Sequence, residues 1–473
     1  MKYLLILIVL LQYQMAISQS KDTDFKEALR LIDIWLDAQR DFGRLPGLSV
    51  AIGKDQDIIF SKGYGYADVE NKIPMTAETM GSICSISKLF TSIAVMQLWE
   101  QGKLRLDDSI SALLPAYNLK QQYGETVPVT LRSMLTHSSG LPREAAYSYW
   151  SGPDFYFPTS KEMNQKLKEQ QTLYPSSTYF QYSNLGMALL GEVVASVSKS
   201  SYETYVEKNI LQPLNLTNTR PSLPRNLWGN KMAIGYSALY RDGTRKKMPL
   251  FQTNGIAPAA GFSSNVTDLL KFAAWQFRVL NGKQEILRPS TLKEMQRVQW
   301  LDPDGKVTWG LGFLIFKEGG TTYLGHDGSC PGYRSLLTLN PKNKFAVSVL
   351  INGQGVSTGK FDIPIFKILD KVKEATDTTT KNIDLEVYAG KYDSYDWSGE
   401  NIILPWKGKL AIFNVPSNDP VEGMSLYKYI SKDTFRKVRK DDETLGEVLH
   451  FERDANGKVI RYHRNNNYSP RIK

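Results

Sequence analysis

The sequence predicts an α+β protein, in which helices flank an antiparallel sheet, followed by a small all-β domain. Strand-like runs at residues 48–52 and 58–60 precede a helical middle. Strand-like runs return after it, at residues 309–316, 322–325, 334–339 and 345–351. Because strands stand on both sides of the helices, both ends of this region are expected to share one sheet.

The remaining elements of this region follow in chain order. Apolar residues at helical spacing predict a helix over 24–41, and the turn residues 54–57 join the first two strands into a hairpin. Residues 106–211 are mainly helical, with a loop at 136–142. After Gly261, a Ser-Asn-Val-Thr-Asp start opens a helix that reaches Phe277.

Composition divides the chain further. The predicted segments are a signal peptide at 1–18, the α+β domain at 19–370, a linker at 371–382 and a β-domain at 383–473. The segment 371–382 is predicted to be a linker because it contains almost no apolar residues. Aromatic residues, short alternating runs and hairpin signals at 407–409 and 456–457 predict a barrel-like antiparallel domain at the end.

The first residues have the pattern of a secretory signal. Lys2 gives a basic start, residues 4–11 are apolar, and the small residues Ala16 and Ser18 predict cleavage after Ser18. An apolar run this short cannot span a bilayer, and no later run approaches the required length. We therefore expect an exported protein, periplasmic or extracellular, without a transmembrane segment.

The composition excludes several classes of function. The 473 residues are 42% hydrophobic and 22% charged, typical of a globular protein with two or three domains. The formal net charge of +10 is mild for this length, and its densest clusters, 245–247 and 436–440, are short, so no nucleic-acid partner is expected. Without a His-Glu-x-x-His or Cys-x-x-Cys motif, we expect no metal and no cofactor.

Ser85 and Lys88 stand three residues apart at the start of a helix that is apolar on nearly every face up to Trp99. Residues at this spacing face the same way, and removal from water disfavours the charged form of an amine. Lys88 is therefore predicted to accept a proton from Ser85, the nucleophile. The spacing alone is not specific, because Ser-x-x-Lys also begins at Ser18, Ser196, Ser290, Ser357 and Ser425.

Tyr182 is the only tyrosine followed two positions later by an asparagine, Asn184. One interpretation is that Ser183 or Asn184 caps a helix over 185–194. The other is that Tyr182 shares the proton of Ser85 and hands it to a leaving group, while Asn184 holds the lysine and a substrate amide. The sequence leaves both open.

A third motif, Gly-His-Asp-Gly-Ser-Cys-Pro-Gly at 325–332, stands between strand-like runs. Its glycines allow backbone to lie close to a substrate. Acyl transfer needs two main-chain N–H groups directed at the developing oxyanion, and Ser85 and Ser329 are predicted to supply them. His326 belongs either to this site or to a strand end, where it would make a surface hydrogen bond.

Taken together, Ser85-x-x-Lys88, Tyr182-Ser183-Asn184 and His326-Asp327-Gly328 resemble the three motifs of the serine β-lactamase and penicillin-binding protein superfamily. The chain is most similar to its class C branch, with the related esterases and D-amino-acid peptidases. The resemblance covers residues 45–368, and the tail resembles the lipocalin-like β-domain often appended to these hydrolases. Supporting phrases begin at Pro46, Gly102, Leu135 and Gly261.

The resemblance implies a β-lactamase/transpeptidase-like fold with a helical subdomain, an active site between sheet and helices, and a covalent acyl-serine intermediate. The predicted catalytic residues are Ser85, Lys88, Tyr182, Asn184, His326 and Ser329. His137 falls in a phrase that the family uses structurally and is left out of this set.

One position departs from the family pattern. Where penicillin-recognising members usually place Lys followed by Thr or Ser, this chain has His326 and Asp327. Those family residues engage a substrate carboxylate, which an inward-pointing Asp327 would repel. We therefore predict weak turnover of penicillins relative to simple esters or to amides without that carboxylate. Gly328 and Arg334 are also predicted to contact substrate, and Arg334 would supply a cation.

The cysteines permit two interpretations. Cys84 precedes Ser85 and Cys330 follows Ser329, so they lie close together if both serines serve one oxyanion hole. Export permits a disulfide that braces the hole, and a similar placement occurs in some carbapenem-hydrolysing class A β-lactamases. Alternatively, two small buried side chains point apart and form no bond.

We therefore expect a serine hydrolase of class C β-lactamase or DD-peptidase type. It would act on a small-molecule or peptide ester or amide as an esterase, a D-amino-acid peptidase or a β-lactamase. The alternative is a non-catalytic or slowly deacylating penicillin-binding-like protein that binds cell-wall or glycan ligands.

Overall fold

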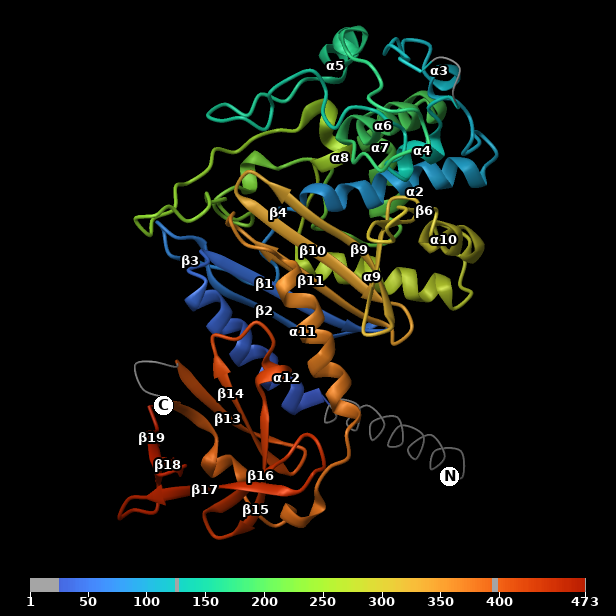
Figure 1. Ribbon diagram of the computed structural model, residues 1–473. Helices are drawn as coiled ribbons and strands as arrows, with labels where there is room; N and C mark the ends of the chain where they lie inside the picture. The colour runs from blue at the N-terminus through green and yellow to red at the C-terminus, as the bar shows by residue number, and fades with distance from the viewer. Residues whose placement is uncertain (1–24, 124–126, 394–398, 473) are drawn as a thin grey trace, which may run out of the picture. The chain divides into compact units, whose positions relative to one another are not determined.

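The computed structural model describes residues 25–123, 127–393 and 399–472 (Figure 1). By their contacts these residues form two compact units, one over Leu45–Asp362 and the other joining the segment before Leu45 to the chain from Ile363 on. The predicted signal peptide lies outside the described residues. No helix in these three ranges is both long enough and apolar enough to cross a membrane.

The unit over Leu45–Asp362 is built on a nine-stranded antiparallel sheet in the order β3-β2-β1-β11-β10-β9-β8-β7-β6. Its strands are β1 (Gly47–Lys54), β2 (Asp57–Asp68), β3 (Ile73–Pro74), β6 (Trp300–Leu301), β7 (Thr308–Trp309), β8 (Leu314–Glu318), β9 (Thr321–Cys330), β10 (Tyr333–Asn340) and β11 (Phe345–Ile351). β1 pairs with β11, with Leu48 opposite Ile351. Strands from both sides of the helical middle therefore lie side by side, which confirms the predicted fold class.

Helices pack on this sheet and form a group at one end of it (Figure 1). They are α2 (Ser87–Glu100), α3 (Ile110–Leu113), α4 (Leu131–Leu135), α5 (Ser160–Lys166), α6 (Asn184–Ser198), α7 (Tyr202–Val206), α8 (Ala257–Ala260), α9 (Val266–Leu280) and α10 (Pro289–Gln296), and α11 (Gly359–Asp370) begins here. α9 packs on β1 and β11, while α2 contacts α6 and α8. Every residue of α2 from Ser87 to Leu98 is buried, as its uniformly apolar sequence predicts.

Two predicted elements differ in the structure. The run at 309–316 is split into β7 and β8, because Gly312 takes a φ of +85° in the turn between them. A side chain there would also meet Ser92 Oγ, 2.0 Å from an added Cβ. The motif at 325–330 does not separate strands but is itself the end of β9.

The second unit contains an eight-stranded antiparallel sheet whose strands follow chain order. They are β12 (Gly390–Asp393), β13 (Glu400–Trp406), β14 (Lys409–Val415), β15 (Ser425–Ser431), β16 (Thr434–Val438), β17 (Leu445–Arg453), β18 (Val459–Arg464) and β19 (Asn467–Pro470), with α12 (Pro420–Gly423) between β14 and β15. A bridge between Tyr392 and Arg471, and an Ile472 N–H bond to Lys391 O (2.9 Å), nearly close the sheet. The domain is thus barrel-like, as the resemblance to lipocalin-like domains implies.

The contacts divide the chain differently from the predicted boundaries. The helix over residues 25–42 belongs with the barrel-like sheet, where Trp35 Nε1 donates to Ser417 O (2.8 Å). The predicted linker at 371–382 also belongs to this unit: Thr380 is buried and donates to Gly408 O (2.7 Å). Its polar residues form local turns against the sheet, which composition alone does not distinguish from a free linker.

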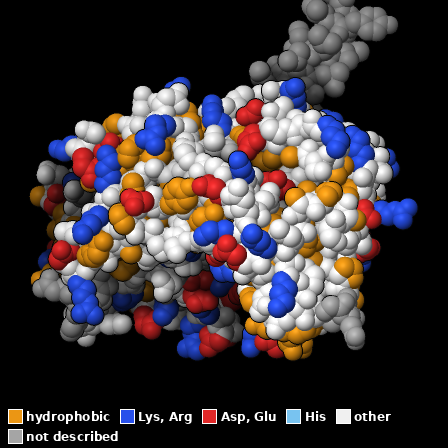
Figure 2. Space-filling view, turned by 90° about the horizontal axis from the view of Figure 1, so that it is seen from above, with side chains coloured by type: hydrophobic (Ala, Val, Ile, Leu, Met, Phe, Trp, Pro, Cys, Tyr) orange, Lys and Arg blue, Asp and Glu red, His pale blue; other side chains and the backbone are white. Residues whose placement is uncertain are grey.

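Basic and acidic side chains are interspersed over the face of the molecule shown in Figure 2. The excess of Lys and Arg therefore does not form a single basic patch on that face.

Candidate active site

Ser85 lies in η1 (Cys84–Ile86), a single 3₁₀ turn that leads directly into α2. Ser87 Oγ donates to Cys84 O (2.5 Å) and accepts the N–H of Phe262 (3.0 Å), which fixes this turn. Ser85 is partly exposed, whereas Lys88 is fully buried one turn further on. The helix start therefore presents a hydroxyl to solvent and keeps the amine behind it out of water.

The Nζ atom of Lys88 is surrounded by three oxygens. It lies 3.1 Å from Ser85 Oγ, 2.8 Å from Asn184 Oδ1 and 2.8 Å from the main-chain oxygen of Ala259. Burial lowers the pKa of Lys88 to about 7, although the carboxylate of Glu144 opposes this effect. Near neutral pH, Lys88 is therefore uncharged in a large fraction of the molecules, and this is the form that can accept a proton.

Tyr182 also reaches Ser85. Burial raises the pKa of Tyr182 above its ordinary value, although the interaction with the nearby Ser85 side chain opposes this effect. The ring lies against two basic groups, with Lys88 Nζ 4.7 Å and Arg143 Cζ 4.8 Å from its centroid. Tyr182 therefore keeps its phenol proton near neutral pH, and Lys88, whose Nζ lies 3.1 Å from Ser85 Oγ, is the better acceptor for the serine proton.

The loop before α6 is held by a segment near residue 140. Ser183 Oγ accepts the N–H of Gly186 (2.8 Å) and donates to Pro142 O (2.7 Å). The N–H of Ser183 donates to Nδ1 of buried His137 (3.1 Å). Ser183 therefore caps the helix, as the first interpretation predicts, and Asn184 bonds Lys88, which is one contact that the second predicts. His137 has the structural role that was expected.

Glu144 was not found from the sequence. Its two carboxylate oxygens lie 2.8 and 3.0 Å from Asn184 Nδ2, and it also accepts the hydroxyl hydrogen of Tyr149. Glu144 stands two positions after the phrase at Leu135–Pro142, and its nearness to this phrase is the one feature of the sequence that points to it. Of the two contacts predicted for Asn184, the structure shows the one to the lysine.

His326 is buried on β9, with its ring centroid 6.2 Å from that of Tyr182. Its Nδ1 lies 2.5 Å from Asp327 O. Because a carbonyl oxygen only accepts, the ring proton belongs on Nδ1. Nε2 has no hydrogen-bond partner among the described residues, so it presents a lone pair. Burial and then Lys88 lower the pKa of His326, which keeps the ring neutral.

The end of β9 has one edge that faces η1 instead of a strand. β8 pairs with β9 from Thr321 only as far as Gly325, whereas β10 pairs with it up to Cys330. An added Cβ at Gly328 would lie 2.4 Å from Ile83 O and 3.0 Å from Cys84 Cβ. Glycine is therefore required for η1 to pack this closely against the strand.

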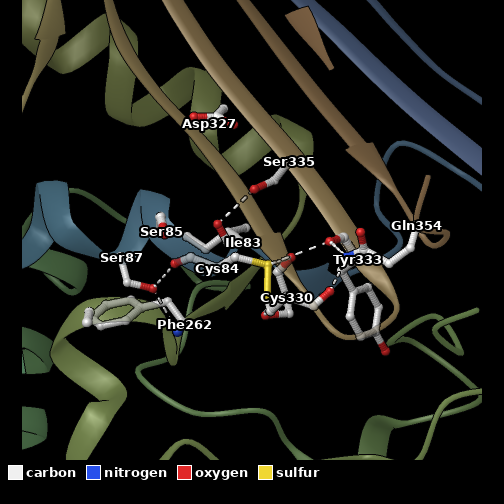
Figure 3. Close-up of a disulfide and its surroundings, with 12 residues drawn as sticks. Ile83, Cys84, Ser85, Ser87, Phe262, Asp327, Cys330, Tyr333, Ser335 and Gln354 are labelled. Carbon is white, nitrogen blue, oxygen red and sulfur yellow. Dashed lines mark hydrogen bonds between the residues drawn. A yellow bond between two sulfur atoms is a disulfide. The ribbon is translucent and has the colours of Figure 1, made fainter. Parts of the chain in front are cut away.

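The structure contains the Cys84–Cys330 disulfide (Figure 3). Ser335 Oγ on β10 donates to Ile83 O (2.7 Å) beside it. Of the two interpretations of the cysteines, the bonded one holds. It ties the residue before Ser85 to the residue after Ser329.

The remaining predicted residues lie on the exposed face of the same strand pair. Asp327 and Ser329 are exposed, and Ser329 is paired in register with Arg334 on β10. The Asp327 and Arg334 side chains approach to 4.0 Å, with half of the Asp327 side chain exposed. The carboxylate is thus placed beside a cation rather than inside the buried cluster around Lys88.

Two proteins show sequence similarity to this chain. Protein flp of Staphylococcus aureus (strain COL) is 25% identical over 327 residues, which cover 68% of this chain and 62% of the relative. Beta-lactamase-like protein 2 of Dictyostelium discoideum is 28% identical over 328 residues, 68% of this chain and 59% of the relative. The chain therefore spans less than two thirds of the length of these relatives.

Solved structures share the fold. The octameric penicillin-binding protein homologue from Pyrococcus abyssi aligns with a TM-score of 0.65 at 24% identity, covering 93% of this chain and 99% of that one. D-amino acid amidase from Ochrobactrum anthropi aligns with a TM-score of 0.60 at 24% identity, covering 73% and 97%. The Beta-lactamase family model matches residues 33–364, well over half of the sequence. The chain belongs to the Beta-lactamase family.

Proposed function

We propose that the chain is an exported serine hydrolase of class C β-lactamase or DD-peptidase type that acts on esters or amides through an acyl-Ser85 intermediate. One observation carries the proposal: the fully buried amine of Lys88 lies 3.1 Å from the hydroxyl of Ser85 at the start of a buried helix, and this burial lowers its pKa to about 7. An uncharged amine within hydrogen-bonding distance of a serine hydroxyl is the arrangement that activates a serine nucleophile.

In the proposed reaction, neutral Lys88 takes the proton of Ser85 while Oγ bonds to the substrate carbonyl carbon. The N–H groups of Ser85 and Ser329 stabilise the oxyanion. The bond to the leaving group then breaks, and Tyr182 passes it the proton from Lys88. Water attacks the acyl-serine, which releases the acid and restores the Ser85 hydroxyl. His326 orients the substrate through its unpaired nitrogen.

The substrate is proposed to lack the carboxylate of a penicillin. Half-exposed Asp327 disfavours a second carboxylate, and Arg334 only partly offsets it at 4.0 Å. Simple esters and amides of D-amino acids are the leading candidates, in agreement with the D-amino acid amidase among the structural relatives. Export is supported by the disulfide, because such bonds persist in oxidising compartments.

The test is a substrate panel on the purified chain and on Ser85→Ala. The panel contains a p-nitrophenyl ester, a D-amino-acid p-nitroanilide and a chromogenic cephalosporin. We expect turnover of the ester or the anilide that disappears in Ser85→Ala. Binding of a fluorescent penicillin without turnover of any substrate would instead support the binding protein described above.

A further inference from the structure

We infer that Glu144 is a positioning residue that makes Lys88 direct its lone pair at Ser85. It does so by fixing which end of the Asn184 amide faces the lysine. This inference rests on the proposed function, because it concerns how the proton acceptor of that reaction is oriented.

The argument starts from the hydrogen-bond capacity of a neutral amine. Uncharged Lys88 has two N–H groups and one lone pair, and three oxygens lie within 3.1 Å of its Nζ. The oxygens of Ala259 and Asn184 only accept, so they take the two N–H groups. The hydroxyl of Ser85 is the one partner of the three that also donates. The lone pair is therefore left for the proton that Ser85 must give up.

This arrangement depends on the orientation of Asn184. The two ends of an asparagine amide have similar size, and a flipped amide would place NH₂ against Lys88. That NH₂ group would donate a hydrogen bond to the lone pair of Lys88, which could then no longer accept the proton of Ser85. Asn184 therefore supports catalysis in one of its two orientations and blocks it in the other.

Glu144 selects the productive orientation. A carboxylate only accepts, so it must face the NH₂ end of Asn184, whose Nδ2 lies 2.8 and 3.0 Å from its oxygens. Two further groups hold the carboxylate: the hydroxyl of Tyr149 donates to it, and Arg143 forms an ion pair with it, with Nε at 3.2 Å. Burial, with a further contribution from Glu144, raises the pKa of Tyr149, so that hydroxyl keeps its proton.

Glu144 also acts on Lys88 through its charge, because its carboxylate raises the lysine pKa that burial lowers. Replacing Glu144 by a neutral residue therefore moves the Lys88 pKa downward. This shift separates the positioning role from a purely structural one, since a loosened fold lowers activity without displacing the pH profile in this direction.

The experiment measures kcat/KM against pH, for the best substrate of the panel, in Glu144→Gln, Asn184→Asp and the double variant. Glutamine can donate as well as accept and no longer fixes the amide. We expect Glu144→Gln to lose about tenfold to a hundredfold, part of what a positioned proton acceptor contributes, with the acid limb displaced to lower pH. In Asn184→Asp, two carboxylates face each other, so we expect a larger loss.

The double variant Glu144→Gln/Asn184→Asp restores a hydrogen bond between an amide and a carboxylate, with the donor and the acceptor exchanged between the two positions. The introduced glutamine amide donates to the introduced carboxylate, whose other oxygen still accepts from Lys88. We expect its kcat/KM to exceed that of Asn184→Asp alone, with the acid limb at higher pH because the carboxylate now adjoins the amine. This comparison remains decisive if Glu144→Gln fails to fold.

Glu78→Gln is the matched control, because Glu78 accepts from the amide of Asn265 (3.0 Å) at the start of α9. It should leave kcat/KM and the pH profile unchanged. A folded Glu144→Gln with wild-type kcat/KM and an unmoved acid limb would overturn the inference, as would a double variant no more active than Asn184→Asp. Wild-type protein without Ser85-dependent turnover would overturn the proposed function instead.

Discussion

Cys84 and Cys330 are bonded to each other across 246 residues of sequence, with their Cα atoms 5.7 Å apart. One precedes Ser85 and the other follows Ser329, the two residues proposed to share an oxyanion hole. The covalent link thus joins the chain segments whose N–H groups are proposed to bind one oxygen atom.

The double variant Cys84→Ala/Cys330→Ala is expected to lose both stability and rate. Removing a native disulfide costs about 2–5 kcal/mol, and a displaced oxyanion donor costs up to about 10²–10³-fold in kcat. Urea unfolding and kcat for an ester measure the two effects. Unchanged kcat would show that the bond does not position the hole.

Activity is expected to rise with pH through about 7, where Lys88 changes from the charged to the neutral form. Below this pH the amine holds its proton and has no lone pair for Ser85, so kcat/KM falls as pH falls. The measurement is kcat/KM from about pH 5 to about pH 9, either side of that transition, for a substrate that does not titrate. A flat profile would exclude Lys88 as the acceptor.

Lys88→Met is expected to lower kcat/KM by about 10²–10⁴-fold, the usual contribution of a positioned acid or base. The matched control is Lys199→Met, because Lys199 forms the same Ser-x-x-Lys spacing with Ser196 at the opposite end of α6. The control should retain full activity. Equal losses in both variants would contradict the assignment of Lys88 as the proton acceptor.

Asp327→Asn is expected to raise kcat/KM for a chromogenic cephalosporin relative to a p-nitrophenyl ester. Two carboxylates about 4 Å apart in water repel each other by about 1 kcal/mol. Removing the Asp327 charge should therefore change the ratio about fivefold. Asp304→Asn, at another exposed carboxylate, is the control and should leave the ratio unchanged. A ratio that moves toward the ester would contradict the assigned role of Asp327.

Gly328→Ala is expected to impair the site without touching a catalytic side chain. Its Cβ would lie 2.2 Å from Ser335 Oγ and 2.4 Å from Ile83 O, so η1 must move away from β9. Overpacking of this kind costs about 1–3 kcal/mol, and kcat should fall with it. Gly423→Ala, where an added Cβ meets nothing within 4 Å, should be neutral. Wild-type kcat in Gly328→Ala would show that this contact is not needed.

The sequence predicts local relationships well and tertiary ones only in part. Ser85 and Lys88 were identifiable because i,i+3 spacing and an apolar helix are local properties. Glu144 was missed because its partner Asn184 lies 40 positions away, and the Ala259 oxygen because a main-chain carbonyl has no signature in sequence. The split between β7 and β8 was missed because it depends on the backbone angle of Gly312, in an otherwise apolar run.

The most direct test of the central claim is mass spectrometric mapping of the protein after treatment with a fluorophosphonate. We predict one adduct on the peptide that contains Ser85, with a labelling rate that increases as the pH is raised through about 7. Modification of a different serine, or an unlabelled Ser85 at every pH, would contradict the assignment of Ser85 as the nucleophile and Lys88 as its proton acceptor.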